Sequence, residues 1–177
     1  LFSDWDLDGS YDESAAVHIQ LEGETAVCDS DAVSIDGSRI TLLDEGTYLV
    51  SGALTDGQIV VDAGDTDKVQ IVLAGASLTC ADSAAIYSKS ADKVFLTLAE
   101  GTENTLTNGG SYIAIDENNI DSVVFSKTDL TLNGSGSLTI DAQAGHGVVS
   151  KDELTITGGS YTVTAAEHGM TGKDLSL

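Results

Sequence analysis

The sequence is short of basic residues and of long apolar runs, and each shortage excludes a class of partner. Only 7 of the 177 residues are Lys or Arg, against 29 Asp and Glu, which gives a formal net charge of -22. Phosphate contacts need clusters of Lys and Arg, so nucleic acid is excluded and an anionic membrane surface is disfavoured. No apolar run reaches the ~18–20 residues of a membrane span, so membrane insertion is not expected. Cations are the natural counterpart of such a chain, although the acidity is also typical of extracellular solubility.

Proline is absent and cysteine occurs twice, at Cys28 and Cys80. Two cysteines are compatible with a disulfide in an oxidising compartment. The repeat alignment below separates them by roughly 9–10 Å, two steps of ~4.8 Å. A bridge needs Cα atoms within about 7 Å. The sequence therefore leaves both a disulfide and two buried thiols open.

A short phrase recurs four times along the chain. It reads Ser88-Lys89, Ser126-Lys127, Ser150-Lys151 and Gly172-Lys173, each time after a mostly apolar pair and with an Asp within three residues. The lysines lie 38, 24 and 22 residues apart. Recurrence at a near-constant period is typical of a repeat architecture, in which stacking turns one sequence position into a column.

Short stretches that alternate apolar and polar residues surround this phrase, as half-buried strands do. One series comprises Lys93–Leu98, Leu130–Leu132, Leu154–Ile156 and Leu175–Leu177, a second comprises Ser137–Asp141 and Ser160–Thr164, and the repeated phrase ends a third. Three short strands per regular coil of about 22–24 residues predict an all-β protein, a single-stranded parallel β-helix or solenoid. An antiparallel sandwich would need hairpin turns between neighbours and would not repeat the phrase at every third strand.

We expect residues 17–177 to form this parallel β-helix and residues 1–16 to form an N-terminal extension or cap. The stretch Ser111–Asp121 is expected to be an insertion in one coil, which accounts for the spacing of 38. The chain begins without Met and stops just inside a repeat, so we expect a processed segment that is truncated at its C-terminus. An open last strand would permit end-to-end self-association.

Several longer phrases resemble the clostridial-type secreted carbohydrate-binding β-helix family. They are Gly57–Ala63, Ala84–Val94, Leu98–Leu106, His146–Asp152 and the opening Phe2–Glu13. The resemblance implies a right-handed parallel β-helix, calcium held by its turns, and a protein that is secreted or on the surface of a bacterium. It also implies binding of plant-type polysaccharides, cellulose and acidic pectic chains, without established catalysis. The fold of that family is similar to the β-helical pectate lyases, some of which use calcium and a basic side chain as the base.

The repeated phrase supplies the candidate ligand-binding residues. They are the four lysines and the two aromatic residues beside them, Lys89, Lys127, Lys151, Lys173, Tyr87 and Phe125. Alternation from the core-facing Val148 places lysines and aromatics outward. An aromatic ring covers the apolar face of a sugar and an ammonium pairs with a uronate, so the column suits an acidic polysaccharide. The alternative is that the lysines neutralise neighbouring Asp and the aromatics merely cover the sheet.

Acidic turns supply the candidate calcium ligands, since carboxylates and carbonyls are the ligands that calcium prefers. The candidates are Asp62, Asp65, Asp67, Asp92, Asp116, Asp129, Asp152 and Asp174. Lysine neutralisation of stacked carboxylates is the alternative. The opening Asp4–Gly9 imitates an EF-hand loop but has Ala15 where the bidentate Glu belongs, so this match is taken as accidental. His146 and His168 are expected to stack as turn residues rather than bind zinc, because no third nitrogen or sulfur ligand is visible.

Three functions remain open from the sequence. The first is a non-catalytic, calcium-supported polysaccharide-binding module. The second is a structural cell-surface adhesin or filament. The third is a calcium-dependent polysaccharide lyase, against which four equivalent lysines argue, because a catalytic base should be the exception in its column.

Overall fold

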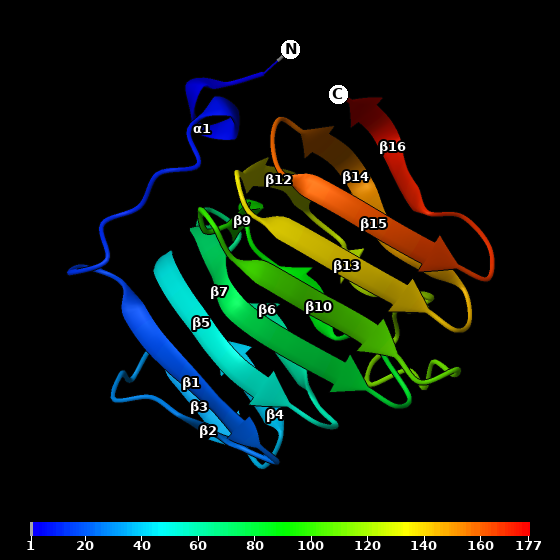
Figure 1. The fold of residues 1–177 in the computed structure, drawn as a ribbon, viewed down its shortest axis with the longest axis horizontal. Coiled ribbons are helices and arrows are strands. Elements are labelled where there is room, and N and C mark those ends of the chain that lie inside the picture. The colour runs from blue at the N-terminus through cyan, green and yellow to red at the C-terminus, as the bar shows by residue number, and fades with distance from the viewer. Residues whose placement is uncertain (1) are drawn as a thin grey trace.

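The computed structural model describes residues 2–177, whose regular elements are strands and one four-residue helix, joined by turns and loops (Figure 1). The elements are α1 (Asp4–Leu7), β1 (Val17–Gly23), β2 (Ala26–Val27), β3 (Val33–Asp36), β4 (Arg39–Leu42), β5 (Gly46–Leu54), β6 (Gln58–Asp62), β7 (Lys68–Cys80), β8 (Ile86–Ser90), β9 (Lys93–Leu98), β10 (Glu103–Asn108), β11 (Ser122–Ser126), β12 (Asp129–Gly134), β13 (Ser137–Ala142), β14 (His146–Ile156), β15 (Ser160–Ala165) and β16 (Met170–Ser176). Within residues 2–177 no helix has the length and apolar character needed to cross a membrane.

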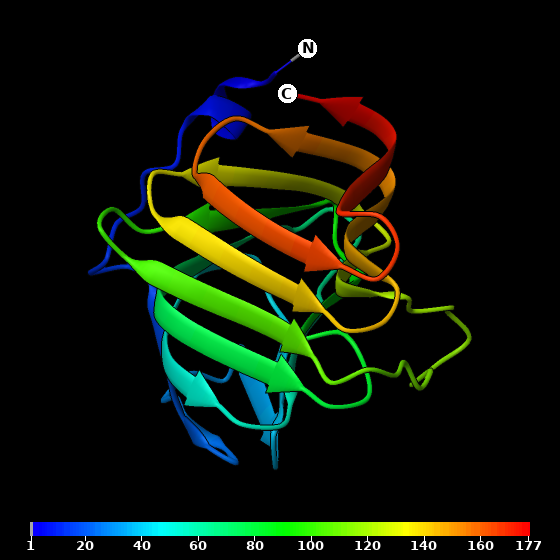
Figure 2. The same cartoon turned by 45° about the vertical axis from the view of Figure 1, so that its right-hand side comes forward.

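All the strands belong to one 16-stranded mixed sheet that curls into a nearly closed, barrel-like shape (Figure 2). Its main path runs β15-β13-β10-β7-β9-β12-β14-β11-β8-β6-β4-β3, with β1, β2, β5 and β16 joined beside it. The pairs β1–β2 and β3–β4 are antiparallel, while the strands that carry the repeated phrase pair in parallel. The prediction of a right-handed, single-stranded parallel β-helix over residues 17–177 is therefore wrong.

Long bent strands explain part of this difference. β7 is 13 residues long and pairs with β9 through Lys68–Leu73 and with β10 through Ser77–Cys80. Gly75, with a φ of 79°, lies between the two halves. β14 likewise pairs with β11 near its start and with β12 near its end. A long strand whose two halves pair with different neighbours joins those neighbours into one continuous sheet, whereas alternation alone suggested separate short strands.

A tight turn explains the antiparallel pairing near the N-terminus. Asp36 pairs with Arg39, so only Gly37 and Ser38 connect β3 to β4. Two-residue loops join antiparallel strands, and a positive φ at the first loop position matches the strand twist. Gly37 has a φ of 58°. The first part of the range expected to form the β-helix therefore contains antiparallel hairpins.

The predicted column of the repeated phrase is confirmed by the strand register. Ser126 pairs with Ser88 on one side and Ser150 on the other, and Ser150 pairs with Gly172. The three serines are buried, as expected of inward positions. The hydroxyls of Ser126 and Ser150 both donate to the carbonyl of Thr128, at 2.7 and 3.1 Å. These two buried hydroxyls are thus paired, as stability requires.

The inside of the barrel is an apolar core of β-branched and leucine side chains, among them Ile71, Leu73, Leu96 and Leu132. Burying each large apolar side chain contributes roughly 1.5–3 kcal/mol. Cys28 and Cys80 are both free thiols, so of the two alternatives the structure has the unbridged one.

A second, smaller apolar cluster lies on the outer face of β8, β11 and β14. Its buried members are Val60, Ala84, Tyr87, Ile120, Phe125 and Val149, with Tyr112 and Ile115 packed against them. The predicted insertion folds back over this face: Tyr87 donates to Asp116 Oδ2 at 2.7 Å and accepts from Asn118 at 2.6 Å. The predicted exposure of Tyr87 and Phe125 is wrong, since they are 0% and 2% exposed. Alternation identified their outward direction but not the segment that covers them.

Candidate functional site

The N-terminal arm, residues 2–16, crosses the outer face of β9 and β12 and is anchored there by Asp6. The Lys93 ammonium lies 2.6 Å from Asp6 Oδ1, and Thr131 Oγ1 donates to the same oxygen at 2.6 Å. The Asp6 side chain is 4% exposed and that of Lys93 14% exposed. Burial by itself would raise the pKa of Asp6, but the hydrogen bonds from Lys93, Thr131 and Ser3 lower it well below its usual range. Removing either partner would leave a buried charge unpaired.

Two further features fix the direction of the arm. Ser3 forms a capping box with Asp6 at the start of α1, which satisfies the N–H groups of Ser3 and Asp6. Gly9 lies directly against the backbone of β12, because a Cβ at this position would be 2.7 Å from the amide nitrogen of Gly134. Only glycine permits that approach. The arm therefore leaves α1 along a defined line over the sheet.

A row of side chains on β5, β7 and β9 forms a floor beside the arm. Thr47 pairs with Gln70, and Gln70 pairs with Phe95, so all three project from the outer face. Gln70 accepts from Thr47 Oγ1 at 2.9 Å and donates to Thr97 Oγ1 at 3.0 Å and to the Ser10 carbonyl at 3.2 Å. These hydrogen bonds hold the amide of Gln70 in one orientation.

Trp5 stands at the edge of this floor. Its ring is 6.0 Å from that of Phe95 with a tilt of 45°, and the Lys68 ammonium lies 5.9 Å from its centre. Lys68 also pairs with Asp92 at 2.8 Å. Phe95 is buried, but Trp5 is 62% exposed. A large aromatic ring held in place yet open to solvent is typical of a binding surface.

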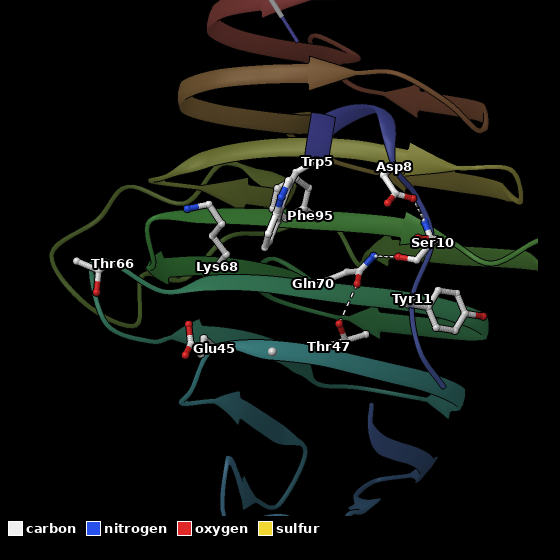
Figure 3. Close-up of a pocket in the computed structure, with 11 residues that line it drawn as sticks. Trp5, Asp8, Ser10, Tyr11, Glu45, Thr47, Thr66, Lys68, Gln70 and Phe95 are labelled. Atoms are coloured by element: carbon white, nitrogen blue, oxygen red, sulfur yellow. Dashed lines mark hydrogen bonds between the residues drawn. The ribbon is translucent and has the colours of Figure 1, made fainter. Parts of the chain in front are cut away.

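These residues enclose an open cavity of about 760 Å³, which Figure 3 shows from the solvent side. It is lined by Trp5, Asp8, Ser10, Tyr11, Glu45, Gly46, Thr47, Thr66, Lys68, Gln70 and Phe95. We call it the arm groove. Glu45, Thr66 and Lys68 lie on one side of Trp5, and Asp8, Ser10 and Tyr11 lie on the arm at the other side (Figure 3). Ligand pockets commonly have volumes of about 300–1,000 Å³ with a few convergent polar groups.

Comparisons with known proteins connect this fold to carbohydrate recognition. A family model described as carbohydrate-binding domain-containing protein matches residues 36–176. The chain belongs to this family. A protein of the same description from Acetivibrio thermocellus is 38% identical over 137 residues, which are 76% of this chain and 48% of that relative.

A solved structure gives a second match. It is the polysaccharide lyase-like protein from C. thermocellum, as a gadolinium derivative, and it aligns with a TM-score of 0.85 and 35% identity. The alignment covers 89% of this chain and 64% of that one. The chain thus spans about half the length of the curated relative and less than two thirds of the solved one. The floor residues of the arm groove lie inside the family match, whereas Trp5 and Tyr11 precede it.

The predicted lysine column of this family member is present but solvated. Lys89 pairs with Asp62 at 3.7 Å, and the Lys151 ammonium lies 5.7 Å from the centre of the Phe125 ring. Lys127 and Lys173 are exposed. Because Tyr87 and Phe125 are covered, the column offers ammonium groups without an open aromatic face beside them.

The predicted calcium ligands do not converge. Asp92 and Asp62 pair with lysines, Asp67 accepts from the Gly64 amide at 2.8 Å, and Asp129 accepts from the Glu153 amide at 3.1 Å. Asp65, Asp152 and Asp174 are exposed. Burial by itself would raise the pKa of Asp116, but hydrogen bonds from Asn118 and Tyr87 lower it.

Groups of three or more possible metal ligands occur elsewhere in residues 2–177. They are His146 with Glu167 and His168, and Asp56 with Cys80 and Asp82. None of the predicted calcium ligands belongs to either group. The opening Asp4–Gly9 is mostly helix α1, with Asp6 held by Lys93, so it does not form an EF-hand loop.

Sequence reasoning missed the arm groove altogether. The available signal was Trp5, the single tryptophan of the chain, with Tyr11 close behind it in a segment interpreted as a cap. Alternation in β7 and β9 also placed Gln70 and Phe95 on the outer face. Nothing in the pattern showed that the arm would lie across precisely those strands.

Proposed function

We propose that the chain is a non-catalytic polysaccharide-binding module that holds sugar residues in the arm groove. The observation that carries the proposal is Trp5, 62% exposed at the rim of an open cavity in a member of a carbohydrate-binding family. The Trp5 ring would cover the apolar face of a pyranose. Gln70, Thr47 and Glu45 would exchange hydrogen bonds with its hydroxyls.

A neutral glucan such as cellulose fits the arm groove better than an acidic pectic chain. Lys68 is the one cationic side chain of its lining, and Asp92 already pairs with it. Asp8 and Glu45 add negative charge to the lining, and the chain as a whole carries a formal charge of -22. Uronates would therefore be repelled at low ionic strength.

Calcium is proposed only as a supporting ion, because most of the predicted ligands already pair with a lysine or accept a hydrogen bond from the protein. Its role would be to screen the repulsion among the carboxylates of this acidic chain, so no binding step depends on it. A location outside the cell, secreted or on a bacterial surface, is proposed because plant-type polysaccharides are met there.

A lyase activity is the second candidate, and the name of the solved neighbour, polysaccharide lyase-like, is what favours it. A lyase needs a base that can take a proton from the carbon beside a uronate carboxylate. The lysine of the arm groove, Lys68, donates to Asp92 and has no free lone pair in this arrangement. Binding without cleavage is therefore the better proposal.

The single tryptophan makes the test direct, because all indole fluorescence comes from Trp5. Titration with soluble cello-oligosaccharides should change this fluorescence, and a pull-down with insoluble cellulose should retain the protein. Trp5→Ala should weaken retention at least about tenfold, since buried aromatic anchors commonly carry 2 kcal/mol or more of binding energy. Leu7→Ala is the matched control, because Leu7 is on the same helix, equally exposed at 62%, and outside the groove lining.

Polygalacturonate, with and without a calcium chelator, forms the second arm of the experiment. Retention on polygalacturonate that exceeds retention on cellulose would overturn the choice of a neutral glucan. Release of unsaturated products would overturn non-catalytic binding. Equal retention of Trp5→Ala and the unchanged protein would overturn the arm groove as the site.

A further inference from the structure

Three neighbouring connections that lead into β11, β14 and β16 bring two histidines and two carboxylates together. Asp121 precedes β11, His146 begins β14, and Glu167 and His168 lie in the turn between β15 and β16. Backbone hydrogen bonds fix these turns against one another. The His146 amide donates to the Asp121 carbonyl at 2.9 Å, and the Glu167 amide donates to the Gly145 carbonyl at 2.8 Å.

The side chains converge on a small volume. The rings of His146 and His168 stack with centres 5.1 Å apart and planes within 18°, as expected from the sequence. His146 Nε2 lies 3.6 Å from Glu167 Oε2 and 3.8 Å from Asp121 Oδ2. One ligand atom each from His146, Glu167 and His168 lie within 4.8 Å of one another.

The charge of this cluster is not balanced within the chain. In the part of the chain that the structure describes, His146 is the only basic side chain that approaches the carboxylates of Asp121 and Glu167, at 3.8 and 3.6 Å. Asp121 Oδ1 is buried and has no hydrogen-bond partner. A carboxylate oxygen that is shielded from water and lacks a donor is costly, so a cation bound at this cluster would be favourable.

We propose that Asp121, His146, Glu167 and His168 form a binding site for a divalent transition metal of the zinc class. Imidazole nitrogen and carboxylate oxygen are ligands that zinc accepts in four-coordinate sites. Two neutral imidazoles and two carboxylates together balance a charge of +2. The metal would link the three connections that lead into β11, β14 and β16, so its role would be structural. The sequence shows no third nitrogen or sulfur ligand beside the two histidines, and the fold supplies carboxylates instead.

Metal binding has one identifiable cost. The His168 amide donates to Nδ1 of His146 at 3.1 Å, so a neutral His146 ring carries its proton on Nε2, the atom that faces the carboxylates. To ligate through Nε2, the ring must carry its proton on Nδ1 and lose this hydrogen bond. The His168 amide is therefore a reporter of metal binding at His146.

The second group, Asp56 with Cys80 and Asp82, is a weaker candidate. The Cys80 thiol is 3.9 Å from Asp82 Oδ1, and burial raises its pKa, which disfavours the thiolate that binds metals. Asp56 Oδ1 already accepts from the Ala81 amide at 3.0 Å. This group serves as an internal comparison in the test.

The test is a calorimetric titration with Zn²⁺ at neutral pH on the metal-stripped chain. One ion per chain is expected, and His146→Ala, His168→Ala and Asp121→Asn should each weaken affinity. Loss of a direct ligand should cost at least about 100-fold, since outer-shell changes alone cost 10–100-fold. His18→Ala is the matched control, because His18 is the remaining histidine and instead contacts the Glu13 carbonyl at 3.0 Å. An amide NMR spectrum should show the His168 resonance shift on addition of Zn²⁺.

Several outcomes would overturn the site. Zn²⁺ affinity that survives His168→Ala but is lost in Asp56→Asn would place the metal at the other group. Binding of Ca²⁺ as strongly as Zn²⁺ would contradict the metal class. Trp5→Ala should bind Zn²⁺ normally, so this proposal and the arm groove succeed or fail separately.

Discussion

Two regions of the outer face of the sheet carry aromatic side chains, and each is covered by a segment that contains no strand. The region under the N-terminal arm remains an open groove, whereas the region under the insertion Ser111–Asp121 is a buried apolar cluster. Over β9, the arm is held mainly by the polar anchor Asp6–Lys93, and Trp5 stays 62% exposed. Over β8, β11 and β14, the insertion packs Ile120 against Phe125 and leaves them 4% and 2% exposed. The strands beneath are alike, so the covering segment decides whether a face binds a ligand or supports the fold.

Phe125→Ala should have the largest effect on the free energy of unfolding, because it leaves a cavity in the apolar cluster under the insertion. Replacing a buried Phe by Ala typically costs 3–5 kcal/mol, from lost transfer energy and the cavity left behind. Denaturant unfolding should show this loss, and Phe125→Leu should cost less than Phe125→Ala, because it leaves a smaller cavity. A loss below about 1 kcal/mol for Phe125→Ala would mean that the insertion does not seal this face in solution.

Asp6→Ala should cost about 3 kcal/mol, because it leaves Lys93 nearly buried without its partner. The loss should be confined to the arm and accompanied by weaker sugar binding, since Trp5 would no longer be positioned. Hydrogen exchange along residues 2–16 and indole fluorescence would measure both effects. Asp4→Ala is the control, since Asp4 is exposed on the same helix. Unchanged sugar affinity in Asp6→Ala would contradict the claim that Asp6 positions Trp5 for sugar binding.

The same anchor should make arm docking pH-dependent. The pKa of Asp6 in the folded chain is well below its ordinary value of about 3.9. The ionised form is therefore favoured by folding, so the contribution is complete above about pH 4 and is lost as the pH falls through the lowered pKa. Trp5 fluorescence followed from neutral to acid pH should detect this detachment. In Asp6→Asn that component of the transition should be absent.

Local pattern predicted the strands but not how they join or what covers them. Alternation identified the inward Ser126 and Ser150, and the recurrence of Ser-Lys predicted their register, because both depend on neighbouring residues. The hairpin at Gly37-Ser38 and the bend near Gly75 depend on backbone geometry that alternation does not encode. The arm groove was beyond reach for a different reason. Asp6 meets Thr131 across 125 residues, and no local pattern specifies such a contact.

The smallest effect should come from the exposed lysines, and it decides between two surfaces. Lys89→Ala should change stability by less than about 1 kcal/mol, because its pair with Asp62 is 3.7 Å long and both side chains are more than 40% exposed. Its affinity for polysaccharide should be unchanged, with Lys127→Ala as a parallel variant. If instead both lysine variants weakened binding and Trp5→Ala did not, the ligand would lie along the lysine column. The exposed ring of Trp5 would then have no part in binding. The location of the ligand would be decided by the positive charge of the lysines and not by how loosely a segment covers the sheet.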